Sequence, residues 1–467
     1  MSTPTPGLAA GHGEGRANKL YFAIWRWHFY AGLYVIPFLF MLAATGLIML
    51  WISVLSGLGD ERMTVTPGGT PMALSALQAA AEAAVPGGTA TQYVAPLSPG
   101  HTAAFAVATD SGKTGVTLNP YTGEVLHSFP WRAGWYDFAN DVHGTLMIGN
   151  TGDWLIEAAA SLALLLIATG IYLHWPRNGG TWREALVPSF SKSGRALWKS
   201  LHGVIGLWVS LLLVVFLISG LSWAGVWGSK FVQAWSTFPA EKWDNVPLSD
   251  ATHASMNHGA AKEVPWGLEQ TPLPASGSLA GTMAITGPVT IDSVGAFAQS
   301  LGFVHRFQLN LPGDAGGVWT ISHDSMSNDG PNPAADRTIH IDQYTGNVLA
   351  DVQYADYSVY AKAMAWGIAF HEGDMGLWNV VLNTVFCLCI VFLTLSGLVM
   401  WWKRRPSGAG RLAAPPRPDL VPLTRGVVLI ALVLSMAFPM LGLSLLAVLA
   451  FDLIVLSSLP PLKRALS

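Results

Sequence analysis

Long apolar runs alternate with polar segments along this chain, and the length of each run predicts how it crosses a membrane. A membrane-spanning helix needs about 20 mostly apolar residues. Four runs reach that length: roughly His28–Trp51, Trp154–Trp175, His202–Trp227 and Leu377–Trp402. A fifth block, Leu423–Leu456, is too long for one helix, and Pro439 predicts a turn near its middle. The pattern therefore predicts four single spans and a closing helical hairpin, which together cross the membrane six times.

The composition agrees with this reading and excludes several other classes of protein. Of 467 residues, 51% are hydrophobic and 11% are charged, whereas soluble domains carry about a quarter of charged residues. A net charge of -3 and only two cysteines exclude a basic nucleic-acid-binding protein and a disulfide scaffold. A polytopic α-helical membrane protein remains.

Basic residues predict the orientation, because Lys and Arg collect in short cytoplasmic segments. Sixteen of the 25 lie in 1–27, 176–199, 403–425 and the last few residues. Both termini are therefore expected in the cytoplasm, with two large loops outside. The predicted parts are a tail at 1–27, spans at 28–53, 150–175, 200–227 and 376–402, outside domains at 54–149 and 228–375, cytoplasmic loops at 176–199 and 403–422, a hairpin at 423–458 and a tail at 459–467.

The two halves of the chain repeat a pattern of histidines and small residues. His28 opens the first span and His202 the third, and a small pair follows each by seventeen residues, Thr45-Gly46 and Ser219-Gly220. The second and fourth spans are preceded by histidines and contain small pairs as well: His143 with Thr169-Gly170, and His371 with Ser396-Gly397. We therefore expect two copies of helix, outside domain and helix, followed by the hairpin.

The outside loops share a Tyr-Thr-Gly motif at Tyr121–Gly123 and Tyr344–Gly346, each between two strand-like segments. Such a turn predicts a hairpin. Alanine-rich Ala73–Ala84 and its counterpart Ser293–Leu301 predict a helix before each hairpin. Each loop is therefore expected to form its own small α+β domain, with an irregular insertion at about 245–290 in the second.

The repeated histidines are the strongest chemical signal, because an ionisable side chain in or beside a span is costly and usually functional. The orientation puts His28 and His202 on the cytoplasmic side and His143 and His371 on the outer side. One imidazole from each repeat could bind haem iron from opposite faces, so the two pairs predict two b-type haems inside the helical bundle. A single interfacial histidine is more often only hydrogen-bonded, and the small pairs fit helix packing equally well. His174 is an alternative ligand, although an interfacial role suits it better.

These segments together resemble the PepSY-associated transmembrane-helix family, which includes iron-regulated inner-membrane proteins and ferric-siderophore reductases. The resemblance covers nearly the whole chain. It rests on Trp27-His28, His143-Gly144, Tyr172–Arg177, Leu201–Gly203, Val264–Trp266 and the two Tyr-Thr-Gly turns. It implies a haem-bearing protein of the bacterial inner membrane, with PepSY-like domains in the periplasm, that can reduce iron held by a siderophore.

A reductase needs an acceptor site and an electron donor. Trp131, Arg132, Trp135 and Tyr136 could hold an anionic ferric siderophore or another ferric chelate, although the same aromatic residues suit an interfacial belt. The cytoplasmic segments hold no dinucleotide-binding βαβ unit, so the expected donor is a membrane quinol or a separate reductase. Asp452, in the hairpin, could relay a proton or could simply be packed and protonated.

Other interpretations stay open from sequence. His253, Met256 and His258 could bind an extra copper or iron ion, although histidines in a loop are usually solvated. The remaining loop histidines show no ligand spacing. A siderophore or metal transporter, which should purify colourless, and a PepSY-type sensor or inhibitory protein, which should not need the span histidines, are the rival functions.

Overall fold

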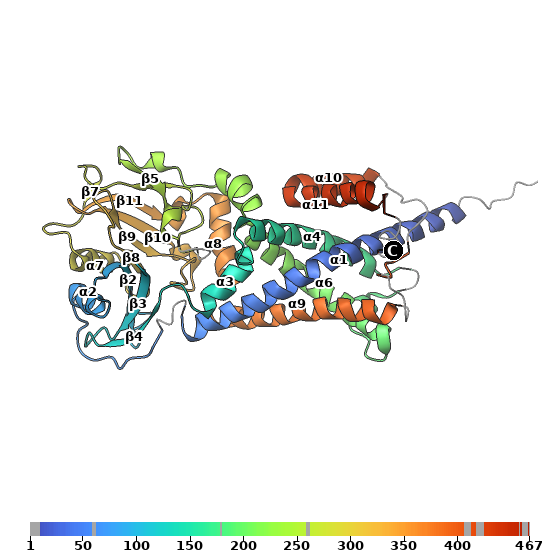
Figure 1. Cartoon of the computed structure of the whole chain (residues 1–467), viewed down its shortest axis with the longest axis horizontal. Coiled ribbons are helices and arrows are strands. Elements are labelled where there is room, and N and C mark those ends of the chain that lie inside the picture. Colours follow the sequence, from blue (N-terminus) through green and yellow to red (C-terminus); the bar gives the residue numbers. More distant parts are fainter. Residues whose placement is uncertain are drawn as a thin grey trace, which may run out of the picture. The chain divides into compact units, whose positions relative to one another are not determined.

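The computed structural model describes residues 10–57, 62–177, 180–257, 262–405, 412–416, 425–456, 458–459 and 466 of the chain (Figure 1). The chain forms two compact units. The first, called the helical unit below, comprises Met1–Ala44, Ile148–Gly228 and Thr384–Ser467. The second, called the sheet unit, comprises Thr45–Met147 and Ser229–Asn383.

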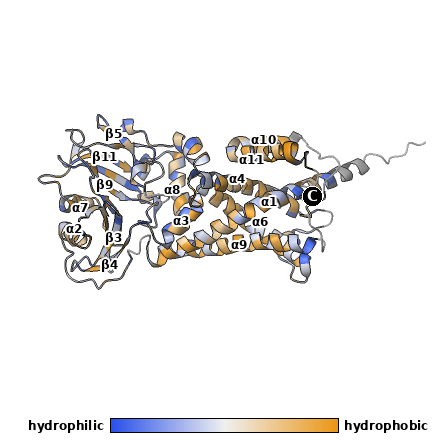
Figure 2. Ribbon diagram, viewed as in Figure 1, coloured by the Kyte–Doolittle hydropathy of each residue, from blue (hydrophilic) through white to orange (hydrophobic). Residues whose placement is uncertain are grey.

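Among the described residues, four helices are long and apolar enough to cross a membrane. They are α1 (Ala10–Leu55), α4 (Asn150–His174), α6 (Gly194–Leu221) and α9 (Leu377–Arg404). Hydrophobic residues cover most of their length in Figure 2. The four predicted spans are therefore present, and α1 begins at Ala10 rather than at the predicted His28.

The closing hairpin is present but shorter than expected. Its arms are α10 (Arg425–Ala437) and α11 (Pro439–Phe451), each of 13 residues, and a π-helical turn, Asp452–Leu456, follows. With this turn the second apolar arm runs on from Pro439 to Leu456. The four long spans are thus present, and the prediction that the hairpin crosses the membrane twice more stays a prediction. The side chain of Asp452 lies outside the described residues.

Buried carboxylates hold the chain where it leaves α6. Glu157, on α4, is 1% exposed and accepts hydrogen bonds from the backbone N–H groups of Val226 and Trp227, both at 3.0 Å. Asp153, one turn earlier, accepts one from Gly225 at 2.9 Å. These bonds satisfy backbone donors that follow the end of α6, where no helical partner remains.

Short helices connect the larger elements. The α-helices among them are α2 (Leu74–Ala83), α3 (Trp135–Thr145), α5 (Trp182–Leu186), α7 (Ile291–Ser300) and α8 (Val359–Glu372). Single turns of 3-10 or π type are Trp227–Val232, Gln233–Trp235, Ala240–Lys242, His253–Met256, Pro333–Ala335 and Tyr354–Asp356.

The two long loops, predicted to lie outside, join one antiparallel sheet of nine strands in the order β4-β3-β2-β1-β8-β9-β10-β11-β7. The strands of the first loop are β1 (Thr89–Val94), β2 (Ala103–Thr109), β3 (Gly112–Leu118) and β4 (Val125–Pro130). Those of the second are β7 (Thr282–Met283), β8 (Gln308–Asn310), β9 (Val318–His323), β10 (Arg337–Asp342) and β11 (Asn347–Gln353). A separate two-stranded sheet pairs β5 (Leu248–Thr252) with β6 (Pro272–Pro274).

The junction between the loops is the pair β1 and β8, in which Tyr93 lies opposite Leu309. The expected two separate α+β domains are therefore fused into one. Outward from this junction, β1 to β4 on one side and β8 to β11 on the other follow one another in chain order, so these two sets of four strands mirror each other. The short strand β7 precedes β8 in the chain and is added beyond β11. Pairing of β1 with β8 covers an edge that each half of the sheet would otherwise expose.

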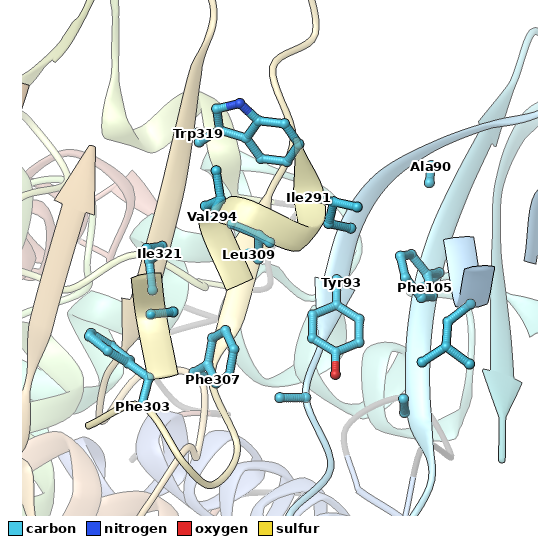
Figure 3. Close-up of a cluster of buried hydrophobic side chains, with 14 of the residues drawn as sticks. Ala90, Tyr93, Phe105, Ile291, Val294, Phe303, Phe307, Leu309, Trp319 and Ile321 are labelled. Carbon is cyan, nitrogen blue, oxygen red and sulfur yellow. The ribbon is translucent and has the colours of Figure 1, made fainter. Parts of the chain in front are cut away.

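One face of this sheet carries the main hydrophobic core of the sheet unit. Leu77 from α2 and Val294 from α7 are almost fully buried against it, together with Phe105, Leu309 and Ile321 from the strands. Figure 3 shows the aromatic rings of Tyr93, Phe105, Phe303 and Phe307 within this cluster. The two helices predicted from alanine-rich and apolar segments thus cover the same face.

The predicted Tyr-Thr-Gly turns connect β3 to β4 and β10 to β11. Gly123 and Gly346 both have φ of +72°, a conformation that favours glycine. The side-chain oxygen of Asn119 accepts a hydrogen bond from the N–H of Tyr121 at 2.9 Å, and that of Asp342 accepts one from Tyr344 at 2.8 Å. The same side-chain-stabilised turn therefore occurs twice.

Candidate histidine sites

The first candidate site lies in the helical unit and contains His28, on α1, and His202, on α6. Each ring bonds a hydroxyl on another helix: His28 Nδ1 lies 2.9 Å from Thr169 Oγ1, and His202 Nδ1 lies 2.8 Å from Ser396 Oγ. His28 and His202 are also near enough to interact electrostatically. The small pairs on α4 and α9 thus supply partners for the two histidines.

The hydroxyl groups decide which nitrogen of each ring carries the proton. Thr169 donates its own hydroxyl proton to Leu165 O at 2.7 Å, and Ser396 donates to Leu393 O at 3.0 Å. Each hydroxyl oxygen therefore accepts from the ring, and Nδ1 of His28 and His202 carries hydrogen. The lone pair is then on Nε2, which is the arrangement that second-shell bonds impose on metal-binding histidines.

The glycine beside each hydroxyl leaves space for the ring. A Cβ added at Gly170 would lie 3.2 Å from His28 Cε1, and one at Gly397 would lie 3.9 Å from His202 Cε1. Sequence analysis identified these pairs only as small. Their hydroxyl function could have been found from the fact that each small residue before the glycine is Ser or Thr.

The second candidate site lies in the sheet unit and contains His143 and His371. Sequence placed them at the outer ends of two spans, but they lie on separate short helices, α3 and α8. Leu146 and Gly373, both with positive φ, end these helices before the spans begin. His143 Nδ1 bonds Thr45 Oγ1 at 2.8 Å, which repeats the imidazole–hydroxyl pairing of the first site.

The ring centroids of His143 and His371 are separated by a distance that suits one metal ion between them. They are 6.4 Å apart, and the ring planes are at 82°. Two imidazoles that bind one ion from opposite sides at about 2.0 Å bring their centroids to roughly 6.3 Å. Burial, and next the neighbouring His143, lower the pKa of His371 to about 3, so the ring is neutral at pH 7, as a metal ligand must be.

The donor set fits haem better than a bare ion. Across the described part of the chain, no group of three or more His, Cys, Asp or Glu side chains is arranged to hold a metal ion. A bare ion between two histidines would lack further protein ligands, whereas a porphyrin supplies four nitrogens and needs only two axial imidazoles. The residues present therefore fit the haem that the repeat predicts.

Buried carboxyl groups accompany the outer site, and sequence analysis missed them. Glu372 follows His371 directly, and burial and then Asp374 raise its pKa well above the ordinary value. Burial likewise raises the pKa of Asp374. Tyr136, on the same helix as His143, has its pKa raised by burial and then by Glu372. Burial near this pair of histidines thus favours the uncharged forms of these groups.

A family described as PepSY-associated TM region matches residues 25–404. The chain belongs to this family. The match includes all four spans, both halves of the sheet and all four paired histidines. The resemblance inferred from the motifs is therefore confirmed, and the protein is a PepSY-associated membrane protein with several apolar helices. No match is found among curated proteins.

His174 has a different role in this PepSY-associated protein from the paired histidines. Its Nε2 lies 2.9 Å from the carbonyl oxygen of Ala185, which can only accept, so Nε2 carries hydrogen. The ring packs against α6 at Gly203, beside His202. These contacts describe a packed, hydrogen-bonded side chain, and the predicted interfacial position stays a prediction.

The four residues predicted to hold a ferric chelate have unlike surroundings. Arg132 forms an ion pair with Glu263, which neutralises its charge. Trp131 is 9% exposed and stacks on Phe129, whereas Trp135 is 75% exposed. Tyr136 is half-buried. Among these four, Trp135 is the side chain most open to a ligand.

The predicted ion site around His253 is not assembled by the residues that the structure describes. His253 is fully buried, with Nδ1 2.7 Å from Thr271 O and Nε2 2.9 Å from His340 Nε2. Both ring nitrogens are therefore engaged. Met256 ends the same 3-10 turn, and His258 lies outside the described residues.

We expect Gly203→Ala to destabilise the helical unit. Its Cβ would lie 2.3 Å from His174 Nδ1, so the ring or the helix must move, at a cost of about 1–3 kcal/mol. Gly206→Ala, on the same helix, is the control, because its nearest neighbour is Leu393 at 3.7 Å. Thermal unfolding in detergent measures the stability of both variants. Adding His174→Ala to Gly203→Ala should restore the unfolding midpoint, because it removes the clashing ring. A Gly203→Ala midpoint equal to that of Gly206→Ala would contradict the clash.

Proposed function

We propose that this membrane protein is a dihaem oxidoreductase that passes electrons across the bacterial inner membrane to ferric iron in the periplasm, most specifically in a siderophore. His28 and His202 would hold one b-type haem, and His143 and His371 the other. The observation that carries the proposal is the outer pair, whose centroid separation of 6.4 Å matches axial ligation of one iron. The mirrored strand order supports the repeat from which the two pairs were inferred.

The residues around the histidines would orient the imidazole rings and set their protonation. Thr169 and Ser396 keep the Nδ1 protons of the inner rings, and Gly170 leaves room beside His28. Thr45 bonds the outer His143 in the same way. Bound haem would supply one-electron transfer, since its iron alternates between ferric and ferrous states. The two histidines of each pair would hold one haem, and two imidazoles for each haem favour electron transfer over binding of other ligands.

The chemistry of the acceptor follows from iron itself. Ferrous iron carries less charge than ferric iron and binds hard oxygen ligands more weakly, so reduction releases it from a chelate. Trp135 and Phe138 form an exposed edge-to-face pair on α3, the helix that carries His143, and their centroids are 5.7 Å apart. This aromatic pair is the proposed contact for the chelate. The proposed donor is a membrane quinol or a separate reductase.

A visible spectrum of the detergent-purified full chain tests this function. Oxidised and dithionite-reduced samples should show sharp low-spin b-type bands, and a pyridine haemochrome assay should give about two haems per chain. Dithionite-reduced protein should then be reoxidised by a ferric hydroxamate as ferrous iron appears. A colourless protein from haem-replete cells would overturn the proposal and favour a transporter or a sensor.

We expect Thr169→Val to weaken haem binding at the inner site by about 10–100-fold, because a lost second-shell hydrogen bond typically costs that much. Valine keeps the shape but cannot accept the proton of His28 Nδ1. Transfer of haem to apomyoglobin measures the loss. Thr394→Val is the control, since Thr394 is 4% exposed on α9 and its hydroxyl donates only to Val391 O at 2.8 Å. Equal transfer rates in the two variants would argue against the role of the hydroxyl.

A further inference from the structure

The helical unit contains a cleft of about 800 Å³ at the basic end of its spans. Its walls come from the early part of α1, the end of α4, the short helix α5 and the start of α6. The volume is in the range of sites for small organic ligands, about 300–1,000 Å³. Neither pair of histidines proposed to bind haem lines it, so the proposed function leaves the cleft unexplained.

The charge of the cleft indicates an anionic ligand. Arg177, Lys192 and Lys199 line it, whereas Glu184 is the single carboxylate among its lining residues. Lys192 approaches Glu184 only to 3.9 Å, and both side chains are largely exposed. The interaction energy of such an exposed ion pair is small, so the cleft keeps an excess of positive charge.

Arg177 is held in place before any ligand binds. Its guanidinium carbon lies 4.0 Å from the ring centroid of Tyr172 and 5.5 Å from that of Tyr21, and it donates a hydrogen bond to the carbonyl of Tyr172. Cation–π contacts orient the group while leaving its other N–H donors available. A planar fork of donors matches the oxygens of a phosphate.

The lining also contains apolar side chains that are open at the surface. Phe22 is 37% exposed and Trp175 is 53% exposed, and both belong to or directly follow membrane-spanning helices. Tryptophan at a helix end is typical of the headgroup level of a bilayer. A soluble phosphate needs no such apolar surroundings, whereas a ligand with acyl chains does.

We propose that this cleft binds the phosphate headgroup of an anionic phospholipid, with Arg177, Lys192 and Lys199 around the phosphate and the acyl chains beside Phe22 and Trp175. Basic pockets between membrane helices are known to select such headgroups. The cleft shares His174 with the packing around Gly203, so an occupied cleft stabilises this part of α6. The inference is independent of haem.

Native mass spectrometry of the full chain tests the proposal, after exchange from nanodiscs of phosphatidylcholine alone or mixed with phosphatidylglycerol. The wild type should retain phosphatidylglycerol selectively. Lys192→Gln/Lys199→Gln should bind it roughly 30-fold more weakly, at about 1 kcal/mol for each lost cation. Both lysines are exposed, so the variant should fold normally. Arg183→Gln, an exposed cation on α5 outside the cleft, is the matched control and should bind like the wild type.

Thermal unfolding provides a second readout, because a ligand that binds only the folded state raises the midpoint. Phosphatidylglycerol should raise the midpoint of the wild type and of Arg183→Gln, but much less that of the double variant. Equal retention of both lipids by the wild type would overturn the proposal. So would displacement of the lipid by inorganic phosphate or glycerol phosphate, which assigns the cleft to a soluble ligand, or by a quinone, which assigns it to the electron donor.

Discussion

Replacing His371 with alanine is expected to lower the haem content from about two per chain to about one and to leave the inner haem spectrally intact. His143→Ala should give the same result, because either change leaves the outer iron with a single imidazole. His28→Ala and His202→Ala should remove the inner haem instead. The affinity of each variant for the haem that it loses should fall by more than about 100-fold, since loss of a hydrogen bond to a ligand histidine alone costs about 10–100-fold.

Haemochrome assays and redox titration of the four variants measure which haem each variant loses. A wild-type titration with two resolved potentials should become a titration with one, and the missing potential should be the same within each pair. His305→Ala is the control, since His305 is exposed in the sheet unit. Two haems retained in all four variants would refute the ligand assignment, and each pair losing a different haem would support it.

The sequence predicted the elements well, because apolar run length and turn residues are local signals. The four spans, the hairpin at Pro439 and both Tyr-Thr-Gly turns could all be found from fewer than 35 neighbouring residues. The number of crossings stays a prediction. Pro439 divides the apolar block into α10, of 13 residues, and α11, of 13 residues followed by the π-helical turn Asp452–Leu456.

The merged sheet could not be predicted, since it depends on contacts between distant parts of the chain. Tyr93 pairs with Leu309 across more than two hundred residues, and the strands of either loop alone would form a plausible sheet. The hydroxyl partners of the histidines could not be predicted for the same reason. Periodicity identified Thr169 and Ser396, but it could not show which helix each one faces.

The candidate sites were likewise predicted only in part. The repeat identified four histidines, and in the structure the ring centroids of His143 and His371 lie 6.4 Å apart. The buried pair of His253 and His340 was missed, because the two residues are separated by 87 positions and no metal-ligand spacing marks them. This pair has a large expected effect on how the stability of the sheet unit depends on pH.

The protons of this pair are fixed by its neighbours. Thr271 O can only accept, so His253 Nδ1 donates to it at 2.7 Å. Neutral His253 then accepts at Nε2 from His340 Nε2 at 2.9 Å, and His340 Nδ1 accepts from the Thr320 hydroxyl at 2.9 Å. Every nitrogen is satisfied while both rings are neutral. A further proton would place two N–H groups against each other.

Burial therefore lowers the pKa of His253 from 6.5 to about 4, and burial and then His253 lower the pKa of His340 well below 6.5. The unfolded chain takes up protons below pH 6.5 and the folded chain does not, so stability falls as the pH drops from 6.5 toward 4. Between pH 6.5 and 5 a histidine that stays neutral in the folded chain should cost about 1.6 kcal/mol, because the unfolded ring is already half protonated at pH 6.5. Asp329 acts in the opposite direction, because burial raises its pKa to about 7.

We therefore expect the wild type to lose about 3 kcal/mol more stability between pH 6.5 and 5 than His253→Gln/His340→Gln, which keeps polar side chains that do not titrate. For a unit of this size the difference corresponds to roughly 10 °C in the unfolding midpoint. Tryptophan fluorescence during heating of the full chain in detergent measures it. Comparing the two proteins removes the contribution of Asp329, which both retain. His127→Gln, an exposed change on β4, should follow the wild type, whereas parallel pH profiles for the wild type and the double variant would show that the pair does not control the response.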